Sequence, residues 1–203
     1  MLPMMKISKP KLLELVKTLG LVRSSDLAHY GISRISLTRA VRKGSLERVS
    51  RGLYGLPSRH VSAHGTLAEV ALRVPKGVVC LLSALRFHGL TTQAPFEVWL
   101  AIDNKAAVPN IVYPPLRVLR FTGQALTEGV EDQLIDGITV RITSVAKTVA
   151  DCFKFRNKIG LDVAIEALRE ARASHKMTSD QLWHFAKIDR VANVMRPYMD
   201  SLS

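Results

Sequence analysis

The 203-residue sequence has few cysteines and few aromatic residues, which make up 6% of the chain. Cys80 and Cys152 are the only cysteines; they lie far apart, and neither has a CxxC partner. Both lie in apolar surroundings, VVCLLSAL and VADCFKF. We therefore expect two reduced, buried thiols and a cytoplasmic protein.

Long apolar runs are also missing. The longest have only five residues, as at residues 78–82, much fewer than the roughly 20 that a membrane-spanning helix needs. The opening MLPMMKISKPK has no apolar stretch of signal-peptide length. These features again favour a cytoplasmic protein with no membrane-spanning segment.

Acidic residues are scarce in the first third of the chain. Residues 1–60 hold 12 basic and 3 acidic side chains, whereas residues 61–203 hold 17 and 14, so most of the net charge of +12 lies in the first segment. Such an asymmetry favours a polyanionic partner, either nucleic acid or an acidic membrane surface. The alternative is a basic surface that only keeps the protein soluble.

Three short helices separated by glycines are predicted in this basic segment. An apolar stripe over residues 12–19 predicts the first helix, preceded by a possible cap at Ser8. We expect the second to be capped by Ser24 or Ser25, and the third by Ser33. The helices are predicted to end at Gly20, Gly31 and Gly44. This spacing is typical of a helix-turn-helix.

The third helix carries the predicted contacts to double-stranded DNA. Leu37, Ala40 and Val41 share one sector and should face the core. Basic and small polar side chains occupy the rest of the surface and could enter a major groove. The predicted DNA-binding residues on and beside this helix are Ser33, Arg34, Ser36, Thr38, Arg39, Arg42 and Lys43. The alternative is an ordinary amphipathic helix with a basic, solvated face.

A basic hairpin is predicted directly after this helix. Residues 46–49 and 53–56 read as strands around a turn at residues 50–52. Arg48 and Arg51 lie on or beside the turn, where they would contact flanking phosphates or the minor groove. The order of elements predicts a winged helix-turn-helix.

The fold class expected for the whole chain is α+β. Residues 1–57 are predicted to form the winged helix-turn-helix domain, and residues 58–203 a mixed α/β domain. The segment at 58–62 reads as a link. In the second domain, strands are expected at residues 96–102, 116–121 and 138–143, and helices at 65–74, 83–88, 144–155, 161–173, from 178 or 179 onward, and 191–202.

The run GSLERVSRGLYGLP, preceded by DLAHYGIS, resembles the N-terminal domain of the AbiEi antitoxins of abortive-infection (type IV) toxin–antitoxin systems. The residues that match the family pattern are Gly44, Leu46, Arg48, Arg51, Gly52, Tyr54 and Pro57. From the residues alone, Tyr54 is expected to pack in the core. Further along, SALRFHGL and ITVRITSVAKTVADC resemble the C-terminal antitoxin domain less sharply. In the second of these runs, the residues that match the family pattern are Lys147, Thr148 and Asp151.

The resemblance implies a bacterial DNA-binding repressor of its own operon that neutralises a separately encoded nucleotidyltransferase toxin. It implies two DNA-contacting domains acting on an operator with inverted repeats, and no stable complex with the toxin.

The sequence gives only weak evidence for groups of catalytic residues. Ser83, His88 and Asp103 invite a triad interpretation, but no nucleophile-elbow glycines surround the serine, and Ser83 is predicted to cap a helix. Lys147 and Asp151 are spaced i, i+4, which predicts a structural ion pair.

The evidence for a metal site is equally weak. His60 and His64 are four residues apart but form no HExxH motif. We therefore expect no metal, no cofactor and no enzymatic activity. One alternative is a nuclease-like DNA-processing enzyme targeted by the winged helix, although its candidate carboxylates, Glu97, Asp103 and Asp136, are scattered. Another is a winged helix that contacts a protein and caps the toxin directly.

Overall fold

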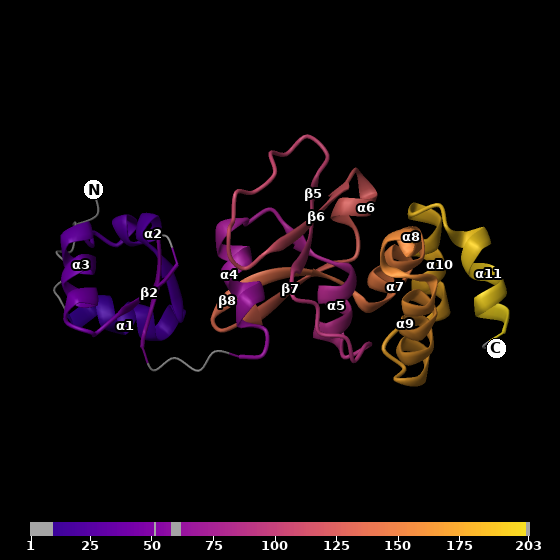
Figure 1. Ribbon diagram of the computed structural model, residues 1–203, viewed down its shortest axis with the longest axis horizontal. Helices are drawn as coiled ribbons and strands as arrows, with labels where there is room; N and C mark the ends of the chain where they lie inside the picture. Colours follow the sequence, from indigo (N-terminus) through magenta and orange to yellow (C-terminus); the bar gives the residue numbers. More distant parts are fainter. Residues whose placement is uncertain (1–9, 51, 58–61, 202–203) are drawn as a thin grey trace, which may run out of the picture. The chain divides into compact units, whose positions relative to one another are not determined.

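The computed structural model describes residues 10–50, 52–57 and 62–201. The chain divides into two compact units. The first unit comprises residues 1–72 with 134–139, and the second unit comprises residues 73–133 with 140–203. Helices and strands occur in both, so the predicted mixture of α and β structure is confirmed (Figure 1). Ser8, Arg51, His60 and most of the predicted link at 58–62 lie outside the described residues.

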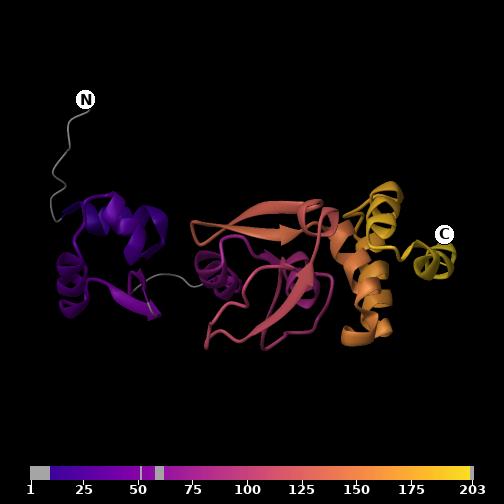
Figure 2. The same cartoon turned by 90° about the horizontal axis from the view of Figure 1, so that it is seen from above.

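The N-terminal part of the first unit contains three helices and three short strands. Figure 2 gives a second view of this part of the chain, coloured indigo. In chain order the elements are α1 (Pro10–Leu19), β1 (Leu21–Arg23), α2 (Ser24–His29), α3 (Arg34–Arg42), β2 (Glu47–Ser50) and β3 (Leu53–Gly55), and α4 (Gly65–Arg73) follows them. The predicted helices and hairpin are confirmed. Ser33 caps α3 as predicted, because its side chain accepts a hydrogen bond from the Ser36 N–H.

The cap predicted for α2 is wrong. Arg23 occupies the N-cap position in an extended conformation, with no side-chain cap hydrogen bond, and both Ser24 and Ser25 lie inside the helix. The reason is β1, which the sequence did not predict. Its last residue, Arg23, pairs with Leu53 of β3, so the helix begins where the strand ends.

The small sheet has the order β1-β3-β2, with both outer strands antiparallel to β3. Tyr54 of β3 lies between Val22 on one side and Arg48 on the other. A buried apolar cluster supports this sheet and the three helices; it consists of Leu12, Val16, Val22, Leu27, Leu37 and Leu46. Tyr54 packs against the cluster, half-buried, which confirms its predicted core position.

The second unit contains most of a five-stranded mixed sheet, ordered β6-β5-β4-β8-β7. Its strands are β4 (Val78–Val79), β5 (Val98–Asp103), β6 (Leu116–Phe121), β7 (Val130–Ile135) and β8 (Ile138–Thr143). Strand β5 runs parallel to β6 and antiparallel to β4, and β4 runs parallel to β8. The predicted strands at β5, β6 and β8 are confirmed, whereas β4 and β7 were not predicted.

Seven helices of the described chain accompany this sheet: α5 (Leu81–His88), α6 (Gln124–Thr127), α7 (Val145–Lys154), α8 (Arg156–Ile159), α9 (Leu161–Ala173), α10 (Ser179–Ile188) and α11 (Ala192–Asp200). Thr178 caps α10 as predicted and forms a capping box with Gln181. The predicted cap at Ser83 is wrong. Cys80 is the N-cap of α5, and Ser83 lies within that helix, where its hydroxyl oxygen accepts a hydrogen bond from the Trp99 N–H at 2.9 Å.

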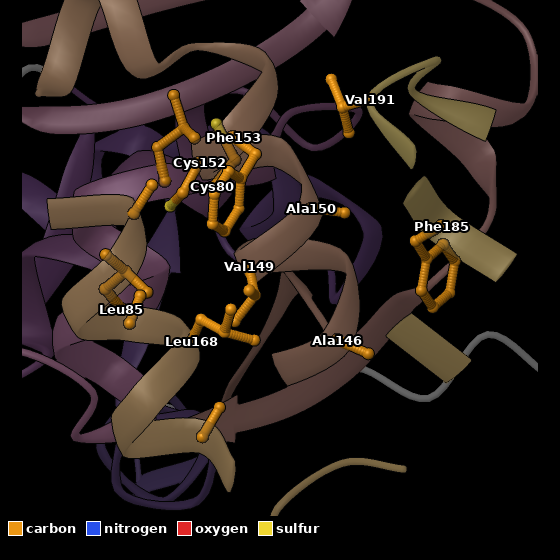
Figure 3. Packing of buried hydrophobic residues seen from close by; sticks show 14 of the residues in the cluster. Cys80, Leu85, Ala146, Val149, Ala150, Cys152, Phe153, Leu168, Phe185 and Val191 are labelled. Atoms are coloured by element: carbon orange, nitrogen blue, oxygen red, sulfur yellow. The ribbon is translucent and has the colours of Figure 1, made fainter. Parts of the chain in front are cut away.

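Helix α7 is the centre of the core in the second unit. Eight consecutive residues, from Ala146 to Phe153, are buried, so every side of the helix is covered by protein. Helices α5, α9 and α10 all contact it. Figure 3 shows Cys80 and Cys152 among these packed side chains, and both thiols are free and buried, as predicted. Burial raises the pKa of both thiols well above 9, which keeps them protonated.

Gly129 packs closely against α7 and α10, and it supplies a stability test. Its φ is +65°, and an added Cβ would lie 2.5 Å from the Phe185 ring and 2.9 Å from Cβ of Lys147. We expect Gly129→Ala to lower the free energy of unfolding by about 2–4 kcal/mol, since the left-handed backbone and the overpacking both oppose alanine. Urea denaturation measures this loss.

Gly89→Ala is the matched control. Gly89 has a left-handed backbone, with φ +66° and ψ +38°, and an added Cβ there meets only Lys176 Nζ at an ordinary contact distance of 3.7 Å. Its expected loss is about 1 kcal/mol, from the backbone alone. Equal losses in the two variants would show that the contact with Phe185 is unimportant.

Candidate nucleic-acid interface

Helix α3 presents one face to the core and the other to solvent. Leu37 is buried, and Ala40 and Val41 pack half-buried against the cluster of the first unit, as predicted. The opposite face is a row of exposed side chains at positions i, i+3, i+4 and i+7, which are Ile35, Thr38, Arg39 and Arg42. Arg39 and Arg42 therefore lie on the outward side, where the sequence predicted them.

The hydroxyl groups on and beside α3 are already used within the helix. Ser33 Oγ accepts from the Ser36 N–H at 3.2 Å and lies 3.1 Å from Ser36 Oγ. Thr38 Oγ1 donates to the carbonyl oxygen of Arg34 at 3.0 Å. Such local bonds satisfy these hydroxyls without any partner molecule. The side chains best placed for polar contacts to a partner are therefore the arginines.

The positive charge of Arg34 does not stabilise α3, in contrast to the charges of Arg39 and Arg42. Arg39 and Arg42 lie in the last turn of α3, where the partial negative charge of the helix end favours a cation. Arg34 lies in the first turn, where the helix dipole disfavours one, and α3 contains no acidic side chain to balance it. An exposed cation in an unfavourable position suggests an anionic partner outside the chain.

Ser36 and Lys43 lie toward one flank of this face. Together with Arg39 they line a hollow of about 290 Å³, whose other walls include Leu12 and Leu13 of α1. The set predicted from the sequence is therefore not one surface. Arg34, Arg39 and Arg42 are exposed around the outward row, whereas Ser36 and Lys43 lie beside α1.

The β2–β3 hairpin contributes one described basic residue. Arg48 is exposed on β2 and pairs across the strands with Tyr54. The register shifts between Arg48 and Ser50, an irregularity at the end of the strand. Arg51, the second predicted hairpin contact, lies outside the described residues.

Ser83, His88 and Asp103 each bond to a separate backbone group. Ser83 accepts from Trp99, as described above, and Asp103 Oδ1 accepts from the Lys105 N–H at 2.8 Å. His88 Nε2 lies 2.7 Å from the carbonyl oxygen of Thr143, so this nitrogen carries the proton. Burial lowers the pKa of His88 below 6.5 and favours the neutral ring. These bonds hold each side chain in a structural position.

The candidate metal ligands and nuclease carboxylates are likewise dispersed. Within the part of the chain that the structure describes, no three His, Cys, Asp or Glu side chains form a group that could hold a metal ion. His64 precedes α4, and Glu97 accepts a hydrogen bond from Arg117 Nε at 2.8 Å in an ion pair.

The predicted Lys147–Asp151 ion pair is confirmed, and it belongs to a larger buried network. Lys147 Nζ donates to Asp151 Oδ1 and also lies 3.3 Å from Asp189 Oδ2. Lys154 Nζ contacts the other oxygen of Asp189 at 3.1 Å. Lys147 and Asp151 are fully buried, and Asp189 is 4% exposed. Asp189 lies 42 residues from Lys147 in the sequence. The i, i+4 spacing that predicted the contact with Asp151 therefore could not predict the contact with Asp189.

The network keeps Lys147 charged. Burial alone would lower the pKa of Lys147, but Asp151 and Asp189 outweigh it and raise the pKa above 10.5. Burial raises the pKa of Asp151 well above 3.8, because desolvation outweighs the attraction of Lys147. Removing the cation would therefore leave the Asp151 carboxylate in an environment that already disfavours its charge.

No helix among the described residues is both long enough and apolar enough to span a membrane.

Comparison with known proteins gives a match for the N-terminal segment. No curated protein matches the chain. Residues 10–57 match the family model described as transcriptional regulator, AbiEi antitoxin, which confirms for this segment the resemblance predicted from the sequence.

Proposed function

We propose that the protein is a DNA-binding transcriptional repressor that autoregulates a toxin–antitoxin operon and acts as its antitoxin. In this proposal α1, α2 and α3 with the β2–β3 hairpin form a winged helix-turn-helix. Helix α3 enters the major groove of double-stranded DNA, and the hairpin contacts the adjacent backbone.

One observation carries the DNA-binding proposal: α3 exposes Arg34, Arg39 and Arg42, the last two on its outward face, and it contains no acidic side chain. Arginine can bond bidentately to guanine in the major groove and can also bind phosphate. The family match over residues 10–57 supports a regulatory role for the same segment.

The finer parts of the proposal rest on the resemblance of the chain to AbiEi antitoxins. They are an operator with inverted repeats, an antagonised nucleotidyltransferase toxin with which no stable complex forms, and a cytoplasmic location. The proposal assigns no catalytic role and no cofactor.

Fluorescence anisotropy with the duplex upstream of the protein's own gene tests DNA binding. A scrambled duplex of the same composition is the control, and specific binding requires the native duplex to bind more tightly. With about four phosphate contacts, affinity should fall roughly 100-fold between 50 and 200 mM salt, because counterions are released on binding. Equal affinity for both duplexes would contradict sequence-specific repression.

The nuclease alternative has its own assay. Incubation with supercoiled DNA and Mg²⁺ or Mn²⁺ should leave the DNA uncut if the protein is only a regulator. Cleavage that disappears on chelation would favour the enzyme instead.

A further inference from the structure

Ile35 is an exposed aliphatic side chain in the middle of a basic surface. It is 64% exposed, although the other branched aliphatic side chains of the same helix, Leu37 and Val41, are buried and half-buried against the core. Thr38, Arg39 and Arg42 follow it at i+3, i+4 and i+7 on the same face, and Arg34 precedes it. All four neighbours are exposed, so Ile35 does not belong to the core of the first unit.

The position of Ile35 along α3 matters as much as its exposure. In a helix that enters the major groove, residues of the N-terminal turn approach the base edges. Ile35 lies in that turn and carries no hydrogen-bonding group. The thymine 5-methyl group is the one apolar group on the major-groove edge of the base pairs.

We infer that Ile35 packs against a thymine 5-methyl group and so selects an A·T pair at one position of each half-site. This inference rests on the proposed function. Arg34, Arg39 and Arg42 supply the contacts to phosphate and guanine. Ile35 adds a contact to an apolar group of one base, which phosphate contacts cannot provide, since phosphates are the same in every sequence.

The surrounding charges favour DNA over a second copy of the chain as the partner of Ile35. In a symmetric dimer through this face, Arg34, Arg39 and Arg42 of one copy would approach the same arginines of the other. Like charges brought together in this way oppose association. A DNA duplex offers a thymine methyl group to Ile35 and phosphate and guanine groups to the surrounding arginines.

Substitution of deoxyuridine for thymidine tests the inference, because it removes only the 5-methyl group. The full-length chain first selects its preferred duplex from a randomised pool. Each thymidine of that duplex is then replaced in turn, and binding is measured by fluorescence anisotropy. At one thymidine per half-site we expect roughly a fourfold loss of affinity, the equivalent of one buried methyl group.

Ile35→Ala should abolish this difference, so that the variant binds the thymidine and deoxyuridine duplexes equally. Ile35→Val, which keeps γ-methyl groups, should retain part of it. Val112→Ala, which shortens a 92% exposed side chain of the second unit, is the control and should retain the whole difference. The thermal melt of Ile35→Ala should match the parent, since the side chain is exposed and alanine favours a helix.

The possible failures are distinguishable. If selection returns no preferred sequence, both the proposed function and the role of Ile35 are wrong. If a preferred sequence emerges but no thymidine is sensitive, or the sensitivity survives in Ile35→Ala, the repressor proposal stands and the inference about Ile35 falls.

Discussion

Replacing Lys147 by methionine is expected to lower the free energy of unfolding by about 3–5 kcal/mol. The ammonium group is fully buried and contacts both Asp151 and Asp189. Methionine fills a similar volume, but it leaves two buried carboxylates with less compensating charge. Urea denaturation at pH 7, followed by circular dichroism, measures the loss.

Lys154→Met is the matched control for Lys147→Met. Lys154 also contacts Asp189, but its side chain is 33% exposed, so solvent screens its charge and we expect a loss of no more than about 1 kcal/mol. Equal losses in the two variants would contradict the importance of burial.

The loss in the free energy of unfolding caused by Lys147→Met should also depend on pH. Without the cation, the buried Asp151 carboxyl group takes up a proton more readily in the folded than in the unfolded state. A carboxyl pKa raised by folding adds stability as the pH falls toward its unfolded value, near 3.8 for Asp151. The loss should therefore be smaller near pH 4 than at pH 7.

Replacing Arg39 and Arg42 together by alanine should weaken binding to the selected operator duplex by about 2–4 kcal/mol. A single base-reading arginine contributes about 1–3 kcal/mol. The two lie three residues apart on one helix face, so their contributions are not expected to add fully. Fluorescence anisotropy at fixed salt measures the change.

Arg169→Ala with Lys187→Ala is the control for this pair. Both side chains are exposed on the second unit, and the double variant removes the same net charge. It should bind the operator nearly as well as the parent. A loss as large as that of the α3 variant would mean that net charge, and not the face of α3, determines binding.

The sequence was most informative where one helix signal extended over several turns. Helix α9 was predicted with the bounds observed, residues 161–173, and the apolar sector of α3 faces the core as expected. Strands β1 and β4 have only three and two residues, too few to show a periodicity. Their positions depend on partners such as β3 and β5, which lie far along the chain.

The errors in the candidate residues have similar physical causes. Ser24, Ser25 and Ser83 all have the side chain that favours an N-cap, but a cap also requires a particular backbone position, and here each lies inside a helix. Asp189 joins the buried network through tertiary packing. Ile35 could not be predicted as a contact from charge, because its unusual property is the exposure of an aliphatic side chain.

The burial of α7 on every side has a consequence for how the second unit comes apart. Helices α5, α9 and α10, which flank it in sequence on both sides, all pack on it. Loosening any one of them would expose part of α7 together with its ionic network. The unit should consequently lose its structure in one cooperative step, with the amide hydrogens of α7 among the last to exchange with solvent.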